Sequence, residues 1–189
     1  MGEFLNRFSL TERALAAAFV VSLMMLISAH LFEHVGGLEP CALCLDQREA
    51  HWAGLAVSGI GLVIALVFRA RLGAAASVGA AALVYAVSAA LAFYHTGVEF
   101  KFWPGPAACA GGGGTIDVTD LLSAVNGEFE TPSCADVPWT LFGISMAGYN
   151  FIGSLGLFAF ALLASMAEVH QARRGRKHGA TRSAPSDNR

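Results

Sequence analysis

The sequence predicts an all-α membrane protein, a bundle of four transmembrane helices with one long loop outside the membrane. Of the 189 residues, 55% are hydrophobic and only 14% are charged, whereas a soluble domain carries about 25% charged residues. The apolar residues form four blocks, each long enough to cross the hydrocarbon core as a helix of about 20 residues. Ten of the twelve lysines and arginines lie near the chain ends or between the second and third blocks.

The helices are expected at about residues 14–34, 48–68, 73–94 and 139–167, in a single domain covering residues 1–170. The first block is longer than the apolar core of a signal peptide and has no clear small-x-small cleavage site, so we expect it to be retained. Loops of residues 35–47 and 95–138 connect helices on one side. The basic, polar segment 171–189 is expected to be a disordered cytoplasmic tail.

The positive charges predict the orientation of the helices. An even number of spans places both termini and the turn containing Arg69 and Arg71 on one side, and all three regions are basic. By the positive-inside rule this side is the cytoplasm. Segments 33–50 and 95–138, on the opposite side, hold ten of the fourteen acidic residues. Two independent patterns therefore predict the same topology.

The second outer loop is expected to contain a tether and a short helix. Four consecutive glycines at 111–114 favour no regular structure. Residues 115–127 then carry an apolar face at helical spacing, made by Val118, Leu121, Leu122 and Val125. A helix of this kind beside a membrane is expected to lie on the bilayer surface.

All four cysteines fall on the predicted outer side: Cys41, Cys44, Cys109 and Cys134. Disulfides persist outside the cytoplasm, and four cysteines allow three pairings. Cys41 and Cys44 stand at the expected start of a helix, where the helix dipole favours a thiolate. The alternative is two inert disulfides that staple the loops, but a two-residue spacing contributes little loop-closure entropy. We therefore favour thiol–disulfide exchange.

Arg48 is the second unusual feature of this region. It follows Cys44 by four residues, one turn along the same helical face. An arginine on the outer side runs against the charge bias, and at the bilayer boundary it needs a partner or must snorkel. It could stabilise a Cys44 thiolate or the developing oxyanion of a lipid-soluble carbonyl acceptor such as a quinone.

Together, these residues resemble the disulfide bond formation protein B (DsbB) family of bacteria. The resemblance rests on PCALCLDQR at residues 40–48, on WPGPAAC at 103–109 and on PWTLFGISMAGYN at 138–150, a context similar to alphaproteobacterial members. It implies an inner-membrane enzyme that reoxidises a periplasmic thioredoxin-like dithiol oxidase (DsbA) with ubiquinone as the electron acceptor, or alternatively menaquinone. Asp46-Gln47 and the glycine-rich segment after Cys109 depart from the better-known members.

The resemblance also implies roles for individual residues. The partner would attack the Cys109–Cys134 disulfide and form a mixed disulfide at Cys109. Cys134 would then exchange with Cys41, and Cys44 would pass electrons to the quinone. Arg48 matches the arginine on the quinone side in the family, and His95 matches a histidine near the quinone. The expected partners are this dithiol oxidase, membrane lipid and the quinone pool, with no nucleic acid.

Two other readings compete with this one. His30, Glu33 and His34 match the H-x-x-E-H order of inverted zinc metallopeptidases, so an outer-face metal-binding or metal-transport protein is one alternative. The other is a vitamin K epoxide reductase-like thiol/quinone oxidoreductase, whose C-x-x-C usually comes late in the chain. Polar residues within or near the spans are read as quinone-pocket residues or as helix–helix hydrogen-bond partners: Glu49, His51, Tyr85 and Asn150.

Overall fold

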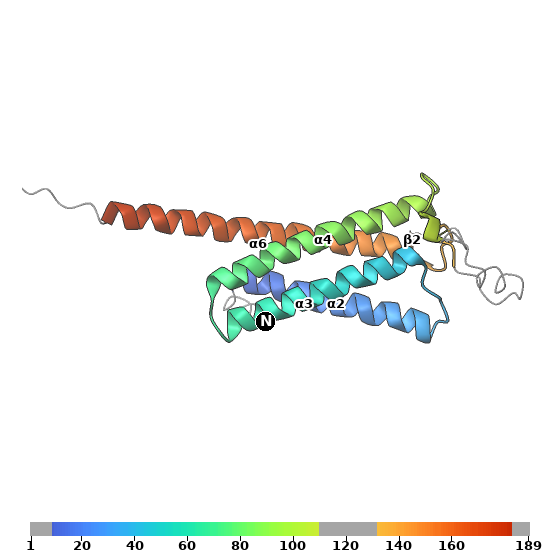
Figure 1. Ribbon diagram of the computed structural model, residues 1–189, viewed down its shortest axis with the longest axis horizontal. Helices are drawn as coiled ribbons and strands as arrows, with labels where there is room; N and C mark the ends of the chain where they lie inside the picture. Colours follow the sequence, from blue (N-terminus) through green and yellow to red (C-terminus); the bar gives the residue numbers. More distant parts are fainter. Residues whose placement is uncertain (1–8, 110–131, 183–189) are drawn as a thin grey trace, which may run out of the picture.

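Four long helices form an up-and-down bundle in the computed structural model, which describes residues 9–109 and 132–182 (Figure 1). The helices are α2 (Leu10–His34), α3 (Ala42–Leu66), α4 (Arg71–Glu99) and α6 (Met146–Arg182). Each is long and apolar enough to cross a membrane, α6 over the part Met146–Gln171. The predicted all-α, four-helix class is confirmed.

The helices bury small and polar side chains and expose large apolar ones. Serines 22, 58, 88 and 154 are fully buried between the helices, whereas Met24, Ile60 and Leu163 are more than 60% exposed. Helix interfaces in lipid are enriched in small residues because they let backbones approach closely. At Gly54, for example, an added Cβ would lie 2.6 Å from Tyr85 Oη. The outer surface of the bundle therefore suits contact with lipid.

Helix α3 begins at Ala42, at the C-x-x-C motif where the sequence places the start of a helix, whereas the span itself was expected only from about residue 48. Cys41 is the N-cap residue: its backbone is extended and its Sγ accepts a hydrogen bond from Cys44 N–H. A side chain that accepts from the third helical N–H satisfies one of the donors left free at a helix start. The C-x-x-C motif thus starts the helix, and the preceding loop is shorter than the expected 35–47.

Helix α6 begins at Met146 and not at residue 139. A small antiparallel hairpin precedes it, formed by β1 (Thr140–Leu141) and β2 (Ile144–Ser145). Phe142 and Gly143 join the strands with φ of 52° and 78°. Two successive positive φ angles belong to the tight type I′ hairpin turn, which a continuous helix cannot accommodate.

Further boundaries differ from expectation, beginning with α2, which starts at Leu10 instead of residue 14. Helix α4 continues to Glu99 instead of ending at residue 94, and α6 continues to Arg182, into the expected tail. The residues just past position 171 include several Ala, Arg and Lys, which are good helix formers. A short 3₁₀ turn, η1 (Ala107–Cys109), follows α4. The amphipathic helix expected at 115–127 lies outside the described residues.

Candidate functional site

The C-x-x-C motif lies at the N-terminal end of α3, with its two sulfur atoms in contact. Cys41 Sγ and Cys44 Sγ are 2.8 Å apart as free thiols, and Cys44 N is 3.4 Å from Cys41 Sγ. Cys41 is buried and Cys44 is half-buried. Both residues sit in the first turn of the helix, where unpaired backbone N–H groups favour negative charge on a nearby sulfur.

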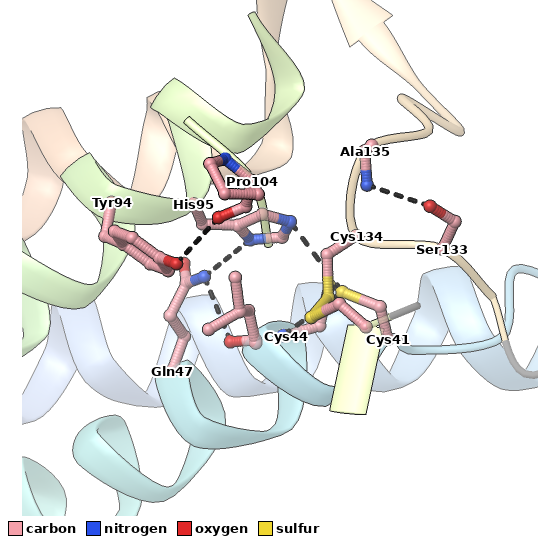
Figure 2. Close-up of a disulfide and its surroundings, with 11 residues drawn as sticks. Cys41, Cys44, Gln47, Tyr94, His95, Pro104, Ser133, Cys134 and Ala135 are labelled. Atoms are coloured by element: carbon pink, nitrogen blue, oxygen red, sulfur yellow. Dashed lines mark hydrogen bonds between the residues drawn. A yellow bond between two sulfur atoms is a disulfide. The ribbon is translucent and has the colours of Figure 1, made fainter. Parts of the chain in front are cut away.

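The second cysteine pair packs directly against the first. Cys109 and Cys134 form a buried disulfide with an S–S distance of 1.95 Å. It joins Cys41 and Leu43 in one buried cluster. Ligand atoms of Cys41, His95 and Cys134 all lie within 4.8 Å of one another, and Figure 2 shows the Cys134 sulfur beside those of the C-x-x-C motif. Residues from distant parts of the chain thus converge on one group of sulfur atoms.

The end of α4 holds the disulfide loop in place. Tyr94 and Trp103 stack with ring centroids 5.9 Å apart. Tyr94 Oη donates to Pro104 O at 2.9 Å, and Trp103 Nε1 donates to Tyr94 O at 2.8 Å. The Trp103 ring lies so close to Gly97 that a Cβ there would be 2.0 Å from it. These contacts fold the chain back towards α3 before it reaches Cys109.

His95 lies at the centre of the site. It is 3% exposed, and its Nε2 is 3.7 Å from Cys41 Sγ. On the other side of the ring, Nδ1 is 2.8 Å from Gln47 Nε2. The structure therefore places this histidine against the sulfur atoms as well as at the wall of the cavity described below.

The chemical environment separates the two thiols of the C-x-x-C motif. The hydrogen bond with Cys44, and secondarily burial, raise the pKa of the Cys41 thiol. The Cys41 thiol therefore holds its proton more tightly than an ordinary cysteine thiol does.

A cavity of about 460 Å³ opens beside Cys44, at the end of the bundle that carries the cysteines. Its walls are predominantly apolar and include Met25, Leu26 and Phe32 of α2. Arg48 and His95 also line it. This volume lies in the ~300–1,000 Å³ range of small-molecule sites, which combine apolar walls with few polar groups. The arrangement suits an apolar ligand that carries a few polar atoms.

Arg48 is held by an acidic partner that we had not predicted. Its Nη1 donates to the Glu33 carboxylate in a salt bridge, and its Nη2 donates to Ala29 O at 3.1 Å. Both partners belong to α2. A paired cation at the membrane boundary avoids much of the cost of an isolated one. Arg48 therefore lies at the cavity with its charge already oriented.

The His30 and His34 rings lie 5.9 Å apart, but polar atoms of the zinc-peptidase pattern are engaged elsewhere. Glu33 is engaged by Arg48, and His30 Nδ1 is 2.8 Å from Leu26 O. In the described parts of the chain, the cluster of three possible metal ligands is Cys41, His95 and Cys134, of which Cys134 is bonded to Cys109. This geometry favours sulfur exchange over the H-x-x-E-H reading.

Gln47 is the site residue that sequence reasoning missed. It is 5% exposed and bonded to both His95 and Asn150. The available signal was a polar stripe on one face of α3, since positions 44, 47, 48 and 51 repeat at helical spacing. Of the other polar residues considered, His51 is buried in the bundle and Glu49 is exposed on its surface.

Comparisons with known proteins support one family. The family model described as "Disulfide bond formation protein DsbB" matches residues 11–164. A protein of Polaromonas naphthalenivorans named "Disulfide bond formation protein B" is 29% identical over 170 residues, covering 87% of this chain and 98% of that protein. A protein of Methylococcus capsulatus with the same name is 33% identical over 151 residues, covering 77% and 88%.

A third relative, from Marinobacter nauticus, also carries the name "Disulfide bond formation protein B" and is 31% identical over 153 residues, 74% of this chain and 86% of that protein. No solved structure gives a significant match. The similarity runs through all four helices and both cysteine-bearing loops, because the matched range begins in α2 and ends in α6.

Proposed function

Since this chain belongs to the DsbB family and is thus a disulfide-forming thiol oxidoreductase of the membrane, we propose that it reoxidises a periplasmic DsbA-like dithiol oxidase and passes the electrons to ubiquinone. The observation that carries the proposal is the approach of Cys41 and Cys134, whose sulfur atoms lie within 4.8 Å. Exchange requires a thiolate to reach a disulfide sulfur directly. The two cysteine pairs are close enough for such a transfer.

The first exchange takes place at the loop disulfide. A partner thiolate attacks Cys109 Sγ, a new S–S bond joins the partner to Cys109, and Cys134 leaves with the electron pair. The partner's second thiol then attacks its own sulfur in the mixed disulfide, so that the partner leaves oxidised and Cys109 is a thiol.

The second exchange passes the reducing equivalents to α3. In the oxidised form of the C-x-x-C motif, the Cys134 thiolate attacks Cys41 Sγ. The Cys134–Cys41 bond forms, the Cys41–Cys44 bond breaks, and Cys44 carries the electron pair at the wall of the cavity. The first turn of α3 favours this negative charge because its unpaired backbone N–H groups lie at the same end of the helix.

The cavity fits a quinone ring. A bound ubiquinone, or alternatively menaquinone, would supply an acceptor for two electrons and two protons. Cys44 and the apolar residues of α2 would contact the ring, and Arg48 would face a carbonyl oxygen on which negative charge develops. His95 would line the same site.

The proposal includes the orientation in the bacterial inner membrane. Both termini would lie in the cytoplasm and the redox cysteines in the periplasm. The charge distribution of the sequence supports this orientation, and so does the fold, in which the turn between α3 and α4 and the cysteine loops occupy opposite ends of the bundle (Figure 1).

The proposed function is tested by mixing the purified protein with ubiquinone and a reduced thioredoxin-like dithiol protein. We expect the absorbance of the oxidised quinone to fall as the dithiol is oxidised, with one quinone consumed per disulfide formed. The same mixture without the dithiol serves as the control. If the dithiol is oxidised without any loss of oxidised quinone, ubiquinone is rejected as the electron acceptor. If the dithiol is not oxidised at all, the whole proposal is rejected.

Replacing Arg48 by methionine should raise the quinone KM about tenfold or more, the scale of a lost charge-assisted hydrogen bond. Arg48→Lys, which keeps the charge, should retain part of the affinity. Steady-state kinetics at varied quinone and fixed dithiol measure the effect, and the rate of mixed-disulfide formation with the partner should stay unchanged. A wild-type quinone KM in Arg48→Met would mean that Arg48 only anchors the helix through Glu33.

A further inference from the structure

A buried chain of hydrogen bonds leads from the middle of the bundle to Cys41. Its consecutive links are His51 Nε2 to Asn150 Oδ1 at 2.7 Å, Asn150 Nδ2 to Gln47 Oε1 at 2.5 Å, and Gln47 Nε2 to His95 Nδ1 at 2.8 Å. The last link is His95 Nε2 to Cys41 Sγ at 3.7 Å (Figure 2). Among the described residues, every buried side-chain nitrogen and oxygen has a partner. The chain is thus fully connected.

One backbone carbonyl sets the direction of these bonds. Gln47 Nε2 lies 3.1 Å from Leu43 O, which can only accept. The Gln47 atom at this position must therefore be the amide nitrogen, and the amide oxygen must face Asn150. Because that oxygen also only accepts, Asn150 presents its own nitrogen to Gln47 and its oxygen to His51.

The same reasoning determines the proton position on His95. The amide nitrogen of Gln47 donates to Nδ1, so Nδ1 carries no proton and the imidazole is neutral. The remaining ring proton is on Nε2, which faces Cys41 Sγ. His95 therefore presents a hydrogen-bond donor towards the sulfur, with the backbone of Cys134 as a second nearby acceptor.

We propose that Gln47 and Asn150 are positioning residues that hold His95 as its neutral Nε2–H tautomer, and that His95 donates this hydrogen to Cys41 Sγ when Cys41 is released as a thiolate. The release closes the relay proposed above, which leaves a Cys41–Cys134 disulfide and a Cys109 thiol, and this assignment of a role rests on that function. The Cys109 thiolate attacks Cys134 Sγ of a Cys41–Cys134 disulfide, the Cys109–Cys134 bond re-forms, and Cys41 leaves with the electron pair.

The benefit of such a donor follows from the surroundings of Cys41. Cys41 is 6% exposed, so water is largely excluded from hydrating a negative sulfur. A buried charge is costly unless it receives hydrogen bonds, and a better-stabilised thiolate leaves faster in disulfide exchange. The donor is held rigidly because the chain links α3, α4 and α6, and His51 Nδ1 joins α2 through Ser22 Oγ at 3.1 Å.

The tautomer can be measured directly by ¹⁵N NMR of histidine-labelled full-length protein in detergent or nanodiscs. We expect His95 Nδ1 to be unprotonated and hydrogen-bonded, and Nε2 to carry the proton. In Gln47→Met, which keeps the size but donates nothing, the Nδ1 resonance should move or the second tautomer should appear. The matched control is Thr96→Val, because Thr96 is the next residue and its Oγ1 donates to Ala92 O in its own helix at 2.8 Å.

Two NMR results would overturn the assignment of positioning roles. One is a protonated Nδ1 on His95 in the unmodified protein. The other is a Gln47→Met spectrum in which the His95 signals coincide with those of the unmodified protein. Unchanged His95 signals in Thr96→Val, with altered ones in Gln47→Met, support the proposal.

The effect on sulfur is measured in a Cys44→Ser background with the Cys109–Cys134 disulfide intact, where Cys41 is the one free thiol of the chain. At fixed pH, His95→Leu should slow alkylation of Cys41 by iodoacetamide about tenfold, and His95→Gln, which can still donate, should restore most of the rate. An unchanged rate in His95→Leu would refute the donor role. Neither the NMR nor the alkylation measurement uses quinone or a partner. A negative result would therefore reject the role of His95 without rejecting the proposed function.

Discussion

Replacing Cys44 by serine is expected to abolish quinone-dependent dithiol oxidation. Loss of a covalent nucleophile lowers turnover by about 10⁴-fold or more, and serine cannot form the disulfide that receives electrons from Cys134. The measurement is the decrease of oxidised quinone in the presence of a reduced thioredoxin-like dithiol protein. Ser28→Ala changes another residue of the cavity wall and should stay close to the wild-type rate.

The same Cys44 variant should retain its first exchange. The Cys109–Cys134 disulfide does not depend on Cys44, so a mixed disulfide with the partner should still form and should be visible on non-reducing electrophoresis. Formation of this mixed disulfide would show that the variant is folded and has lost only the transfer of electrons to the quinone. Quinone reduction at the wild-type rate in Cys44→Ser would show that electrons reach the acceptor by another route.

Replacing Cys134 by serine is expected to trap the complex with the partner. This variant carries Cys109 as a free thiol, which attacks the disulfide of the oxidised partner and forms a mixed disulfide. In the unmodified protein both Cys134 and the partner's second thiol can resolve such a species, whereas in this variant only the partner's thiol can, so the complex lasts longer. We expect a reductant-sensitive band of the combined mass on non-reducing gels.

The control for the trapping experiment is Cys109→Ser. It removes the sulfur proposed to bond to the partner and leaves Cys134 in the same loop. This variant should form no covalent complex. A complex of equal yield in Cys109→Ser would reverse the roles assigned to the two loop cysteines.

Local boundaries were harder to predict than the spans. The hairpin before α6 depends on positive φ angles at Phe142 and Gly143, and phenylalanine is not a residue that signals such a turn. The start of α3 was visible in the sequence only as Pro40 followed by cysteine, because a cysteine sulfur rarely features among the N-cap residues. Hydropathy reports burial in lipid and not the residue at which a helix starts.

The hydrogen-bond and salt-bridge partners of the polar residues could also not be predicted from the sequence. Arg48 stood out as a cation on the outer side, but its position on α3 said nothing of Glu33 on α2, which depends on how the two helices pack. His51 and Asn150 were recognised as polar residues near the spans. Their separation of 99 residues gave no indication that they bond to each other.

The sequence by itself determined the features that depend on composition and local order. These are four spans, basic ends, and a C-x-x-C motif at the mouth of a helix, because each follows from the residues within one segment. Only the tertiary structure decided that Cys134 lies beside Cys41, and that Gln47 bonds both to His95 and to Asn150, which follows Gln47 by 103 residues. Such contacts arise from helix packing, in which small buried residues determine which polar faces meet.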